Sequence, residues 1–329
     1  MSTEVKQARW PRQIPYIIAS EACERFSFYG MRNILTPFLM TALLLAVPEH
    51  LRAGEAKDVF HSFVIGVYFF PLLGGWLADR YLGKYNTILW LSIVYVIGHL
   101  FLALFETSKE GFYTGLFLIA LGSGGIKPLV SAFMGDQFDQ SNKALAQKAF
   151  DIFYFTINFG SFFASLLMPL TLKHFGPAIA FGIPGLLMGL ATLFFWLGRS
   201  RYVHVAPEPK DPHSFLKVVK TALLAKESGK ANGGFYLALV GVALAFFSLS
   251  QTPVLGFVAA FCLALVLLMG FGGAGAAIQL ERARGVHPDI AVDGVRSVLR
   301  ILILFALVTP FWSLFDQKAS TWILQANEM

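Results

Sequence analysis

The stretch Glu21-Ala22-Cys23-Glu24-Arg25-Phe26-Ser27-Phe28-Tyr29-Gly30-Met31-Arg32 places two acids and two guanidiniums inside an apolar run, from about 14 to 45. On a helix with about 100° per residue, Glu21, Arg25 and Arg32 fall within roughly 60° of one another. A charged side chain inside a bilayer costs about 2.5–3.5 kcal/mol on insertion scales, so this stripe must face a wet cavity or partner groups. It indicates a pathway for ions or a charged substrate, with a structural ion-pair network between helices as the alternative.

The composition is that of a membrane protein. Of the 329 residues, 56% are hydrophobic and only 14% are charged, whereas soluble proteins carry about 25% charged residues. A membrane-spanning helix needs about 20 apolar residues. The candidate spans are 14–45, 60–79, 86–106, 111–135, 148–172, 178–198, 234–251, 254–280 and 297–325. The sequence therefore predicts an all-α membrane protein with about nine spans.

Basic residues in the loops predict the orientation. Lys6, Arg9 and Arg12 precede the first span, and seven further lysines and arginines lie between 199 and 230. Because basic loops stay on the cytoplasmic side, we expect a cytoplasmic N-terminus and several passes through the cytoplasmic (inner) membrane. The net charge of +6 is a signal of this topology, and no nucleic-acid partner is expected.

Ionisable groups mark the second span and its end. His61 and Tyr68 lie seven residues apart and therefore share a helix face. A histidine here is a candidate for a proton relay because its charge changes near neutral pH; a hydrogen-bonded structural histidine near the interface is the alternative. The span ends in a glycine-containing turn that carries Asp79 and Arg80 on the predicted cytoplasmic side.

The fourth span contains a lysine deep in apolar sequence. Lys127 follows Gly122-Ser123-Gly124-Gly125, whose small residues allow neighbouring helices to approach closely. A buried ammonium needs a carboxylate partner or loses its proton. Glu21 and Glu24 of the first span are the expected partners.

Further polar groups lie in the fifth and last spans. Tyr154 and Asn158 are one helical turn apart and can offer hydrogen bonds to a cavity; an Asn158 that only joins helices is the alternative. Asp316 lies in the outer half of the last span and also requires a partner. We expect that partner to be Arg32 of the first span.

The sequence between 199 and 233 is a polar connector, and its part from 214 to 226 is a candidate amphipathic helix on the inner leaflet. The two spans that follow carry no charged residue and read as a peripheral hairpin. No phosphate-binding loop, zinc-ligand spacing or nucleophile elbow occurs in the chain. The sequence therefore argues against an enzyme and predicts no metal site.

Four ordered motifs together resemble the proton-dependent oligopeptide transporter family of the major facilitator superfamily. They are Glu21-x-x-Glu24-Arg25-Phe26-x-Phe28-Tyr29, Gly124-Gly125-Ile126-Lys127-Pro128, Phe153-Tyr154-x-x-Ile157-Asn158-x-Gly160-Ser161 and Leu314-Phe315-Asp316-Gln317. Asp79 and Arg80 are similar to the charged loop between helices two and three of that superfamily. Phe28 departs from the pattern, because the family commonly has a tyrosine there.

The resemblance implies a domain organisation. We expect an N-terminal six-helix bundle over 1–200, a cytoplasmic linker over 201–233, a two-helix insertion over 234–282 and the start of the C-terminal bundle over 283–329. This last part corresponds to helix 7 of the family. Family members continue with five more helices, so we expect the chain to be a truncated version of a longer protein.

The resemblance also implies a symporter that imports di- and tripeptides by alternating access. It would work as a monomer, with the proton as coupling ion and no cofactor. The implied proton-coupling residues are Glu21, Glu24, Arg25, Lys127 and His61. The implied substrate-binding residues are Arg25, Tyr29, Arg32, Tyr68, Lys127, Tyr154 and Asn158. The implied gating residues are Arg32, Asp316, Asp79 and Arg80.

Three alternatives stay open at this point. A proton-coupled carrier of another solute, such as nitrate or a drug-like molecule, would use the same fold. A proton-sensing receptor or channel would use the same charged groups without moving peptide. A membrane-embedded enzyme is the third, and it is disfavoured because no nucleophile–base pair or metal constellation is recognisable.

Overall fold

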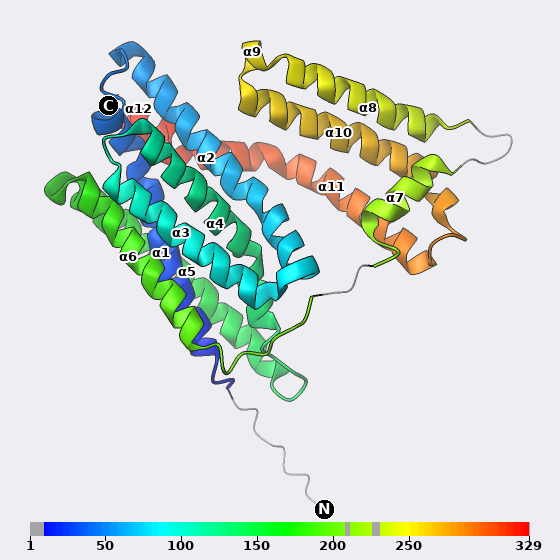
Figure 1. Cartoon of the computed structure of the whole chain (residues 1–329), viewed down its shortest axis with the longest axis horizontal. Helices are drawn as coiled ribbons and strands as arrows, with labels where there is room; N and C mark the ends of the chain where they lie inside the picture. Colours follow the sequence, from blue (N-terminus) through cyan, green and yellow to red (C-terminus); the bar gives the residue numbers. More distant parts are fainter. Residues whose placement is uncertain (1–9, 208–210, 226–230, 329) are drawn as a thin grey trace, which may run out of the picture. The chain divides into compact units, whose positions relative to one another are not determined.

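The computed structural model describes residues 10–207, 211–225 and 231–328, and this part of the chain is helical (Figure 1). It divides into two compact units. The first unit comprises Met1–Glu208 and Asp316–Met329, and the second unit comprises Pro209–Phe315. The all-α prediction is confirmed.

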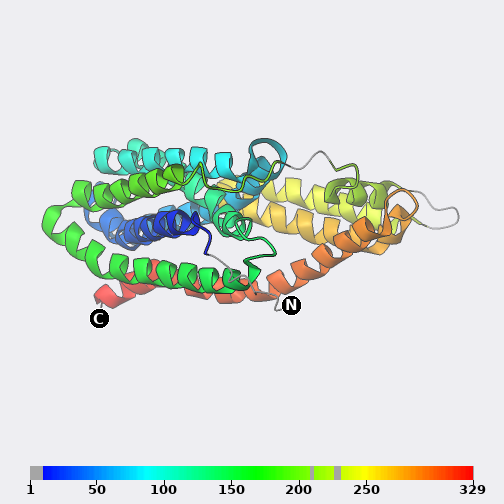
Figure 2. The same ribbon diagram turned by 90° about the horizontal axis from the view of Figure 1, so that it is seen from below.

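Six long helices and one short helix build the first unit. They are α1 (Ile14–Phe38), α2 (Glu49–Leu77), α3 (Gly83–Leu104), α4 (Lys109–Gly135), α5 (Lys143–Phe175), α6 (Pro177–Leu197) and α12 (Thr321–Glu328). The π-helical turns η1 (Leu39–Leu43) and η2 (Ala78–Leu82) extend α1 and α2, and the 3₁₀ turn η4 (Asp316–Ala319) precedes α12. Helix α1 packs against both α5 and α6, and α4 packs against α2 and α3 (Figures 1 and 2).

Glycines set the closest helix contacts in this bundle. A Cβ atom placed on Gly98 of α3 would lie 2.9 Å from the carbonyl oxygen of Gly115 of α4, and a Cβ on Gly115 would lie 2.9 Å from that of Gly98. Gly74 of α2 likewise packs directly on the backbone of Gly125 of α4. The close approach predicted from the small residues of α4 is therefore confirmed, and it is made possible by missing side chains.

Most of the expected spans form, but two boundaries differ. Helix α2 begins at Glu49, well before the expected start at 60, because a run of good helix formers precedes the apolar residues. The last span was expected to be continuous over 297–325, but α11 (Asp289–Phe315) ends before η4 and α12. Asp316, Gln317 and Lys318 interrupt the apolar run at this point.

Seven helical segments among the described residues are long and apolar enough to cross a membrane. They are Glu49–Leu104, Lys109–Gly135, Lys143–Phe175, Pro177–Leu197, Gly233–Ser250, Phe257–Ala283 and Asp289–Phe315. The first of these contains both α2 and α3. Helix α1 is not among them, which is consistent with the charged residues at its centre.

The residues that follow α6 pack onto the end of the first unit. The Tyr202 ring lies 5.3 Å from that of Phe195 in α6 and 5.0 Å from that of Phe133 in α4, measured between centroids. This burial raises the pKa of the Tyr202 hydroxyl above its ordinary value. Gln137 donates from its amide to the carbonyl of Val203 and accepts from the Val203 amide. The polar connector therefore begins as an ordered part of the bundle.

The second unit contains α7 (Phe215–Leu224), α8 (Gly233–Ser250), α9 (Thr252–Leu255), α10 (Phe257–Gln279), the 3₁₀ turn η3 (Leu280–Ala283) and α11. Helices α8 and α10 form the expected hairpin (Figure 1). The amphipathic helix expected over 214–226 forms as α7, and part of its apolar face is covered by protein. Phe215, Leu216 and Leu224 are exposed, so a contact of α7 with the leaflet stays a prediction. Val218 and Ala222 are fully buried against η3 and α11.

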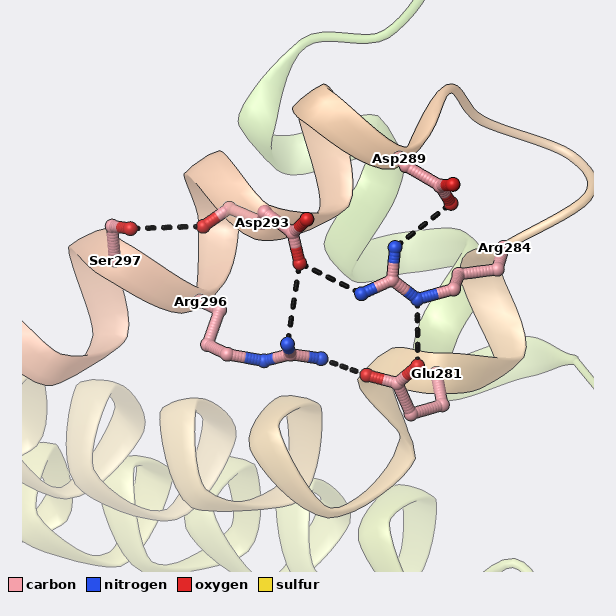
Figure 3. Close-up of polar contacts among 6 residues, drawn as sticks. All are labelled: Glu281, Arg284, Asp289, Asp293, Arg296 and Ser297. Atoms are coloured by element: carbon pink, nitrogen blue, oxygen red, sulfur yellow. Dashed lines mark hydrogen bonds and ion pairs between the residues drawn. The ribbon is translucent and has the colours of Figure 1, made fainter.

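An arginine fixes the turn between η3 and α11 (Figure 3). The Arg284 guanidinium lies 2.8 Å from Asp289 Oδ1, 2.7 Å from Asp293 Oδ1 and 2.6 Å from Glu281 Oε2. Hydrogen bonds to the two aspartates hold the pKa of Arg284 above its ordinary value. Arg296 contacts Asp293 and Glu281 from the next turn of α11. The three acids are exposed and the two arginines are half-buried, so the network orients the turn and adds little stability.

The glycine contact between α2 and α4 makes a stability prediction. Gly74→Ala should lower the free energy of unfolding by about 1–3 kcal/mol, because the new methyl group meets backbone that cannot rotate away. Thermal unfolding of the purified protein in detergent measures the loss. Gly75→Ala is the matched control, since nothing lies within 4 Å of its added methyl group. Equal melting temperatures for the two variants would contradict this account.

Candidate functional site

Three charged side chains of α1 form the centre of the candidate site. Arg25 Nε lies 2.7 Å from Glu21 Oε1 and 2.7 Å from Glu24 Oε2. The helix brings Glu21 and Arg25 together because residues four apart lie on one face. The exposed fractions are 3% for both glutamates and 8% for Arg25. We call these three residues the α1 charge cluster; it carries two acids and one guanidinium and is buried almost completely.

Neighbouring helices hold the α1 charge cluster in place through small residues. A Cβ atom on Gly160 of α5 would lie 3.3 Å from the Ala22 carbonyl oxygen and 3.6 Å from the Arg25 Cβ. One helical turn farther along α5, Ser165 accepts a hydrogen bond of 2.8 Å from the Asn33 amide of α1. Helix α5 therefore approaches α1 closely enough to exclude solvent from one side of the cluster. Burial of this kind strengthens the attraction within the cluster.

Lys127 approaches the cluster from α4, but it contacts aromatic rings. Its Nζ lies 3.8 Å from the ring centroid of Phe28 and 5.7 Å from that of Tyr68. Among the described residues, no carboxylate lies within ion-pair distance of it, so the expected direct pair with Glu21 or Glu24 does not form in this structure. A cation over an aromatic face gains about 0.5–2 kcal/mol. Phe28 thus offers its ring face where the family pattern commonly has a tyrosine.

Arg32 lies two turns beyond Arg25 and is also buried, with 6% of its surface exposed. Its guanidinium carbon lies 5.5 Å from the ring centroid of Phe60 on α2. Asp316, the partner expected for it, has a side chain that lies outside the described residues. The expected Arg32–Asp316 pair therefore stays a prediction.

His61 contacts the end of the described chain. Its Nε2 atom lies 3.2 Å from the hydroxyl of Ser320, which is fully buried beside α12. Among the contacts of the described residues, none joins His61 directly to Glu21, Glu24 or Arg25. The structure therefore places His61 at the contact between α2 and the segment after α11, and a role in proton coupling stays a prediction.

The candidate substrate-binding residues differ in exposure. Tyr68 and Tyr154 are 55% and 58% exposed, whereas Tyr29 is half-buried with its ring edge-to-face to Phe28 at 5.6 Å. Asn158 is exposed, and its amide donates to the Tyr154 carbonyl at 2.8 Å within the same helix. Within the described part of the chain, the Asn158 amide therefore bonds to its own helix and does not join two helices.

The charged turn after α2 lies in η2, where Asp79 is exposed and Arg80 is half-buried. The well-formed ion pair near this turn joins the start of α3 to the end of α4: Lys84 Nζ lies 2.7 Å from Asp136 Oδ2. The sequence reasoning did not find this pair, because its members are 52 residues apart. The gating roles of Asp79 and Arg80 stay predictions.

The sequence reasoning also missed a buried polar group on α3. His99 is fully buried, and its Nε2 atom lies 2.9 Å from the hydroxyl of Ser27 on α1. The Tyr95 ring stacks on the His99 ring at 5.0 Å. The available signal was a histidine in the middle of the apolar span 86–106, where an ionisable side chain is uncommon.

Comparison with known families and structures places these residues in a wider context. A family model described as "POT family" matches residues 85–329. The chain is 78% identical to the POT family transporter PepTSo, with a TM-score of 0.94, covering 98% of this chain and 64% of that one. It is 64% identical to an auto-inhibited POT family peptide transporter, with a TM-score of 0.92, covering 97% of this chain and 63% of that one.

Curated relatives are similar over almost the whole chain. Solute carrier family 15 member 2 from Rattus norvegicus is 33% identical, covering 97% of this chain and 40% of the relative. Peptide transporter 3 from Caenorhabditis elegans is 32% identical, covering 98% of this chain and 42% of the relative. The chain thus spans about two fifths of the length of these relatives.

The α1 charge cluster makes a second stability prediction. Arg25→Met should cost about 3–5 kcal/mol of the free energy of unfolding, because it leaves two buried carboxylates without their cation. Thermal unfolding in detergent at neutral pH measures the loss, which should shrink at low pH as the carboxylates take up protons. Lys84→Met is the control: its pair with Asp136 is partly exposed, so the cost should be about 1 kcal/mol or less. A loss for Arg25→Met that does not exceed the control would contradict the prediction.

Proposed function

Because the chain belongs to the POT family, we propose that the whole protein is a proton-coupled symporter that imports di- and tripeptides across the cytoplasmic membrane. The observation that carries this proposal is the α1 charge cluster: two acids that share one guanidinium, buried inside a membrane-spanning bundle. Burying charged side chains inside a membrane costs free energy, and such residues typically mark a substrate pathway or a proton relay. The relatives named as peptide transporters support the choice of substrate.

The peptide's carboxylate would be bound by the cationic groups near α1. Lys127 is only partly buried, and within the described residues its ammonium has no carboxylate partner to displace. Arg25 and Arg32 supply guanidiniums, which favour bidentate capture of a carboxylate. The peptide backbone would take hydrogen bonds from the polar side chains nearby, which are Tyr29, Tyr68, Tyr154 and Asn158. Recognition of the main chain permits many side chains in the substrate.

The proton would be taken up by Glu21 or Glu24. Arg25 can neutralise one of these two acids, so the second carries a charge that burial disfavours. Protonation of either acid loosens its contact with Arg25 and leaves the cluster electrically neutral. Proton entry is thereby linked to the strength with which the cluster holds a charged substrate. His61, at its contact with Ser320, would tune or share the proton.

Transport would follow by alternating access, in which two halves of the protein rock around a site near the membrane midplane. An Arg32–Asp316 pair would close the outer side, and the turn with Asp79 and Arg80 would control the cytoplasmic side. The protein would work as a monomer in the inner membrane, with its N-terminus in the cytoplasm. The proton is the coupling ion, and no cofactor is required.

Proton movement into liposomes that contain the full-length protein tests the substrate assignment. Addition of dialanine should acidify the lumen, and Lys127→Ala should abolish this response because the substrate carboxylate loses its ammonium partner. Lys84→Ala, which removes an ammonium from the end of the bundle, is the control and should retain most of the response. If dialanine had no effect on correctly inserted protein while nitrate or a drug-like solute moved protons, the family would stand and the substrate would be another solute.

The coupling role of Glu24 makes a separate prediction. Glu24→Gln should abolish uptake driven by a proton gradient, because an amide cannot exchange the coupling proton. It should retain counterflow, in which labelled peptide exchanges for unlabelled peptide without net proton movement. Uptake and counterflow are measured in the same proteoliposomes. Intact driven uptake in Glu24→Gln would remove Glu24 from the coupling mechanism.

A further inference from the structure

A second polar group lies between α1 and α3, and none of the transport roles proposed above uses it. It consists of Ser27, Tyr95 and His99, all of which are 0% exposed. The Ser27 hydroxyl lies 2.9 Å from His99 Nε2. The Tyr95 and His99 rings are stacked, with centroids 5.0 Å apart and an angle of 20° between their planes. We call these residues the α1–α3 polar group.

Several polar atoms in and beside this group lack a hydrogen bond to any described residue. They are His99 Nδ1, the Tyr95 hydroxyl and Glu24 Oε1, whereas Glu24 Oε2 forms the ion pair with Arg25. Burying a polar atom without a hydrogen bond costs about 1–3 kcal/mol in proteins. Such atoms in native proteins are paired with protein or with ordered water. A buried water needs about two to four polar partners, and the atoms of this group and of Glu24 that lack a hydrogen bond are the candidates for that role.

The α1–α3 polar group adjoins the α1 charge cluster. Ser27 follows Glu24 by three residues, so the two side chains are neighbours on the helix surface. On α3, Tyr95 stacks on His99, whose Nε2 atom lies 2.9 Å from the Ser27 hydroxyl. Polar atoms without a hydrogen bond therefore occur on α1, at Glu24, and on α3, at Tyr95 and His99.

Small residues of two further helices enclose this region. A Cβ atom on Gly185 of α6 would lie 3.1 Å from the His99 Cβ, and Gly122 of α4 packs on the Tyr95 side chain. The charged groups that act on Glu24 come from α1, through Glu21 and Arg25, and from α4, through Lys127. Gly160 of α5 faces the Arg25 Cβ, and Gly185 of α6 faces the His99 Cβ. Water held here would be separated from bulk solvent.

We propose that Ser27, Tyr95 and His99 form a buried water-binding site that hydrates the Glu24 carboxylate and so sets the pH range in which Glu24 exchanges its proton. The inference deepens the coupling role given to Glu24 and to that extent rests on the proposed function. His99 acts as a positioning residue. Its neutral imidazole donates from one ring nitrogen and accepts at the other, so it holds Ser27 and a water at once. That water donates to the Glu24 carboxylate and favours its charged form.

The direct test measures Glu24 itself. Infrared difference spectra of the full-length protein as a function of pH report the carboxyl C=O stretch, and Glu24→Gln identifies the band that belongs to Glu24. Ser27→Ala, Tyr95→Phe and His99→Leu each remove polar atoms of the group. Loss of a hydrogen bond to the carboxylate disfavours its charged form, so protonated Glu24 should persist to higher pH by about one pH unit. Ser27→Ala and Tyr95→Phe remove a single hydroxyl and keep the test valid if His99→Leu does not fold.

Ser165→Ala is the matched control, because Ser165 also forms a hydrogen bond with α1, at Asn33, but lies on α5. It should leave the Glu24 band unmoved. An unmoved band in Ser27→Ala and Tyr95→Phe would overturn the proposal, as would an equal shift in the control.

A transport measurement separates this inference from the proposed function. In proteoliposomes, the pH optimum of driven dialanine uptake should move upward in Ser27→Ala and stay in place in Ser165→Ala, while counterflow changes less than about twofold in both. If the unsubstituted full-length protein moved no peptide, the proposed function would fail, and the infrared result would still decide whether the water site exists. If peptide transport were intact but neither the optimum nor the band moved, the water site alone would fall.

Discussion

The interaction on which the first unit depends is the sharing of Arg25 between two buried carboxylates. Each carboxylate lies 2.7 Å from the same guanidinium nitrogen, so neither acid can move independently of the other. A shared cation in a low-dielectric interior is a strong constraint, because separating any partner exposes an uncompensated charge. The packing of α1 against α5 and α6 satisfies this constraint by keeping solvent away on one side. Under the proposed function, the aromatic and hydroxyl-bearing residues around it would define where a charged ligand can approach.

The helices that surround the cluster are joined mainly through glycine. The pairs Gly98–Gly115 and Gly74–Gly125 bring the helix backbones into direct contact. Because lipid provides no hydrophobic driving force between helices, dispersion and weak polar contacts hold them together there. Close backbone contact also limits the room for side chains between helices. Polar side chains that do fit, such as His99 beside Ser27, are consequently held in few positions. The same packing that stabilises the bundle thus confines the polar atoms near Glu24 to a small volume.

Much of this architecture could be predicted from the sequence. Hydropathy located the long helices, and the 3.6-residue period placed Glu21 and Arg25 together on one face, as their 2.7 Å contact shows. Contacts between distant segments were not predictable in the same way. The partner of Lys127 depends on side-chain direction across two helices, so a ring face stands where a carboxylate was expected. The Ser27–His99 pair joins residues 72 positions apart, and no periodicity reports such a distance. The burial of Val218 and Ala222 of α7 was not predicted, because an amphipathic pattern fits a lipid surface and a protein surface equally well.

The ring contact of Lys127 has a consequence for competition among anions. An ammonium held over Phe28 at 3.8 Å is stabilised by a fixed quadrupole that does not dissociate. Under the proposed function, a substrate carboxylate would displace no carboxylate of the described residues from Lys127, and salt would weaken their attraction by screening both charges. Chloride and phosphate would be attracted by the same ammonium. Under the proposed function, discrimination between these anions and a peptide would depend on the spacing of hydroxyl and amide groups along the site, because charge alone favours none of them.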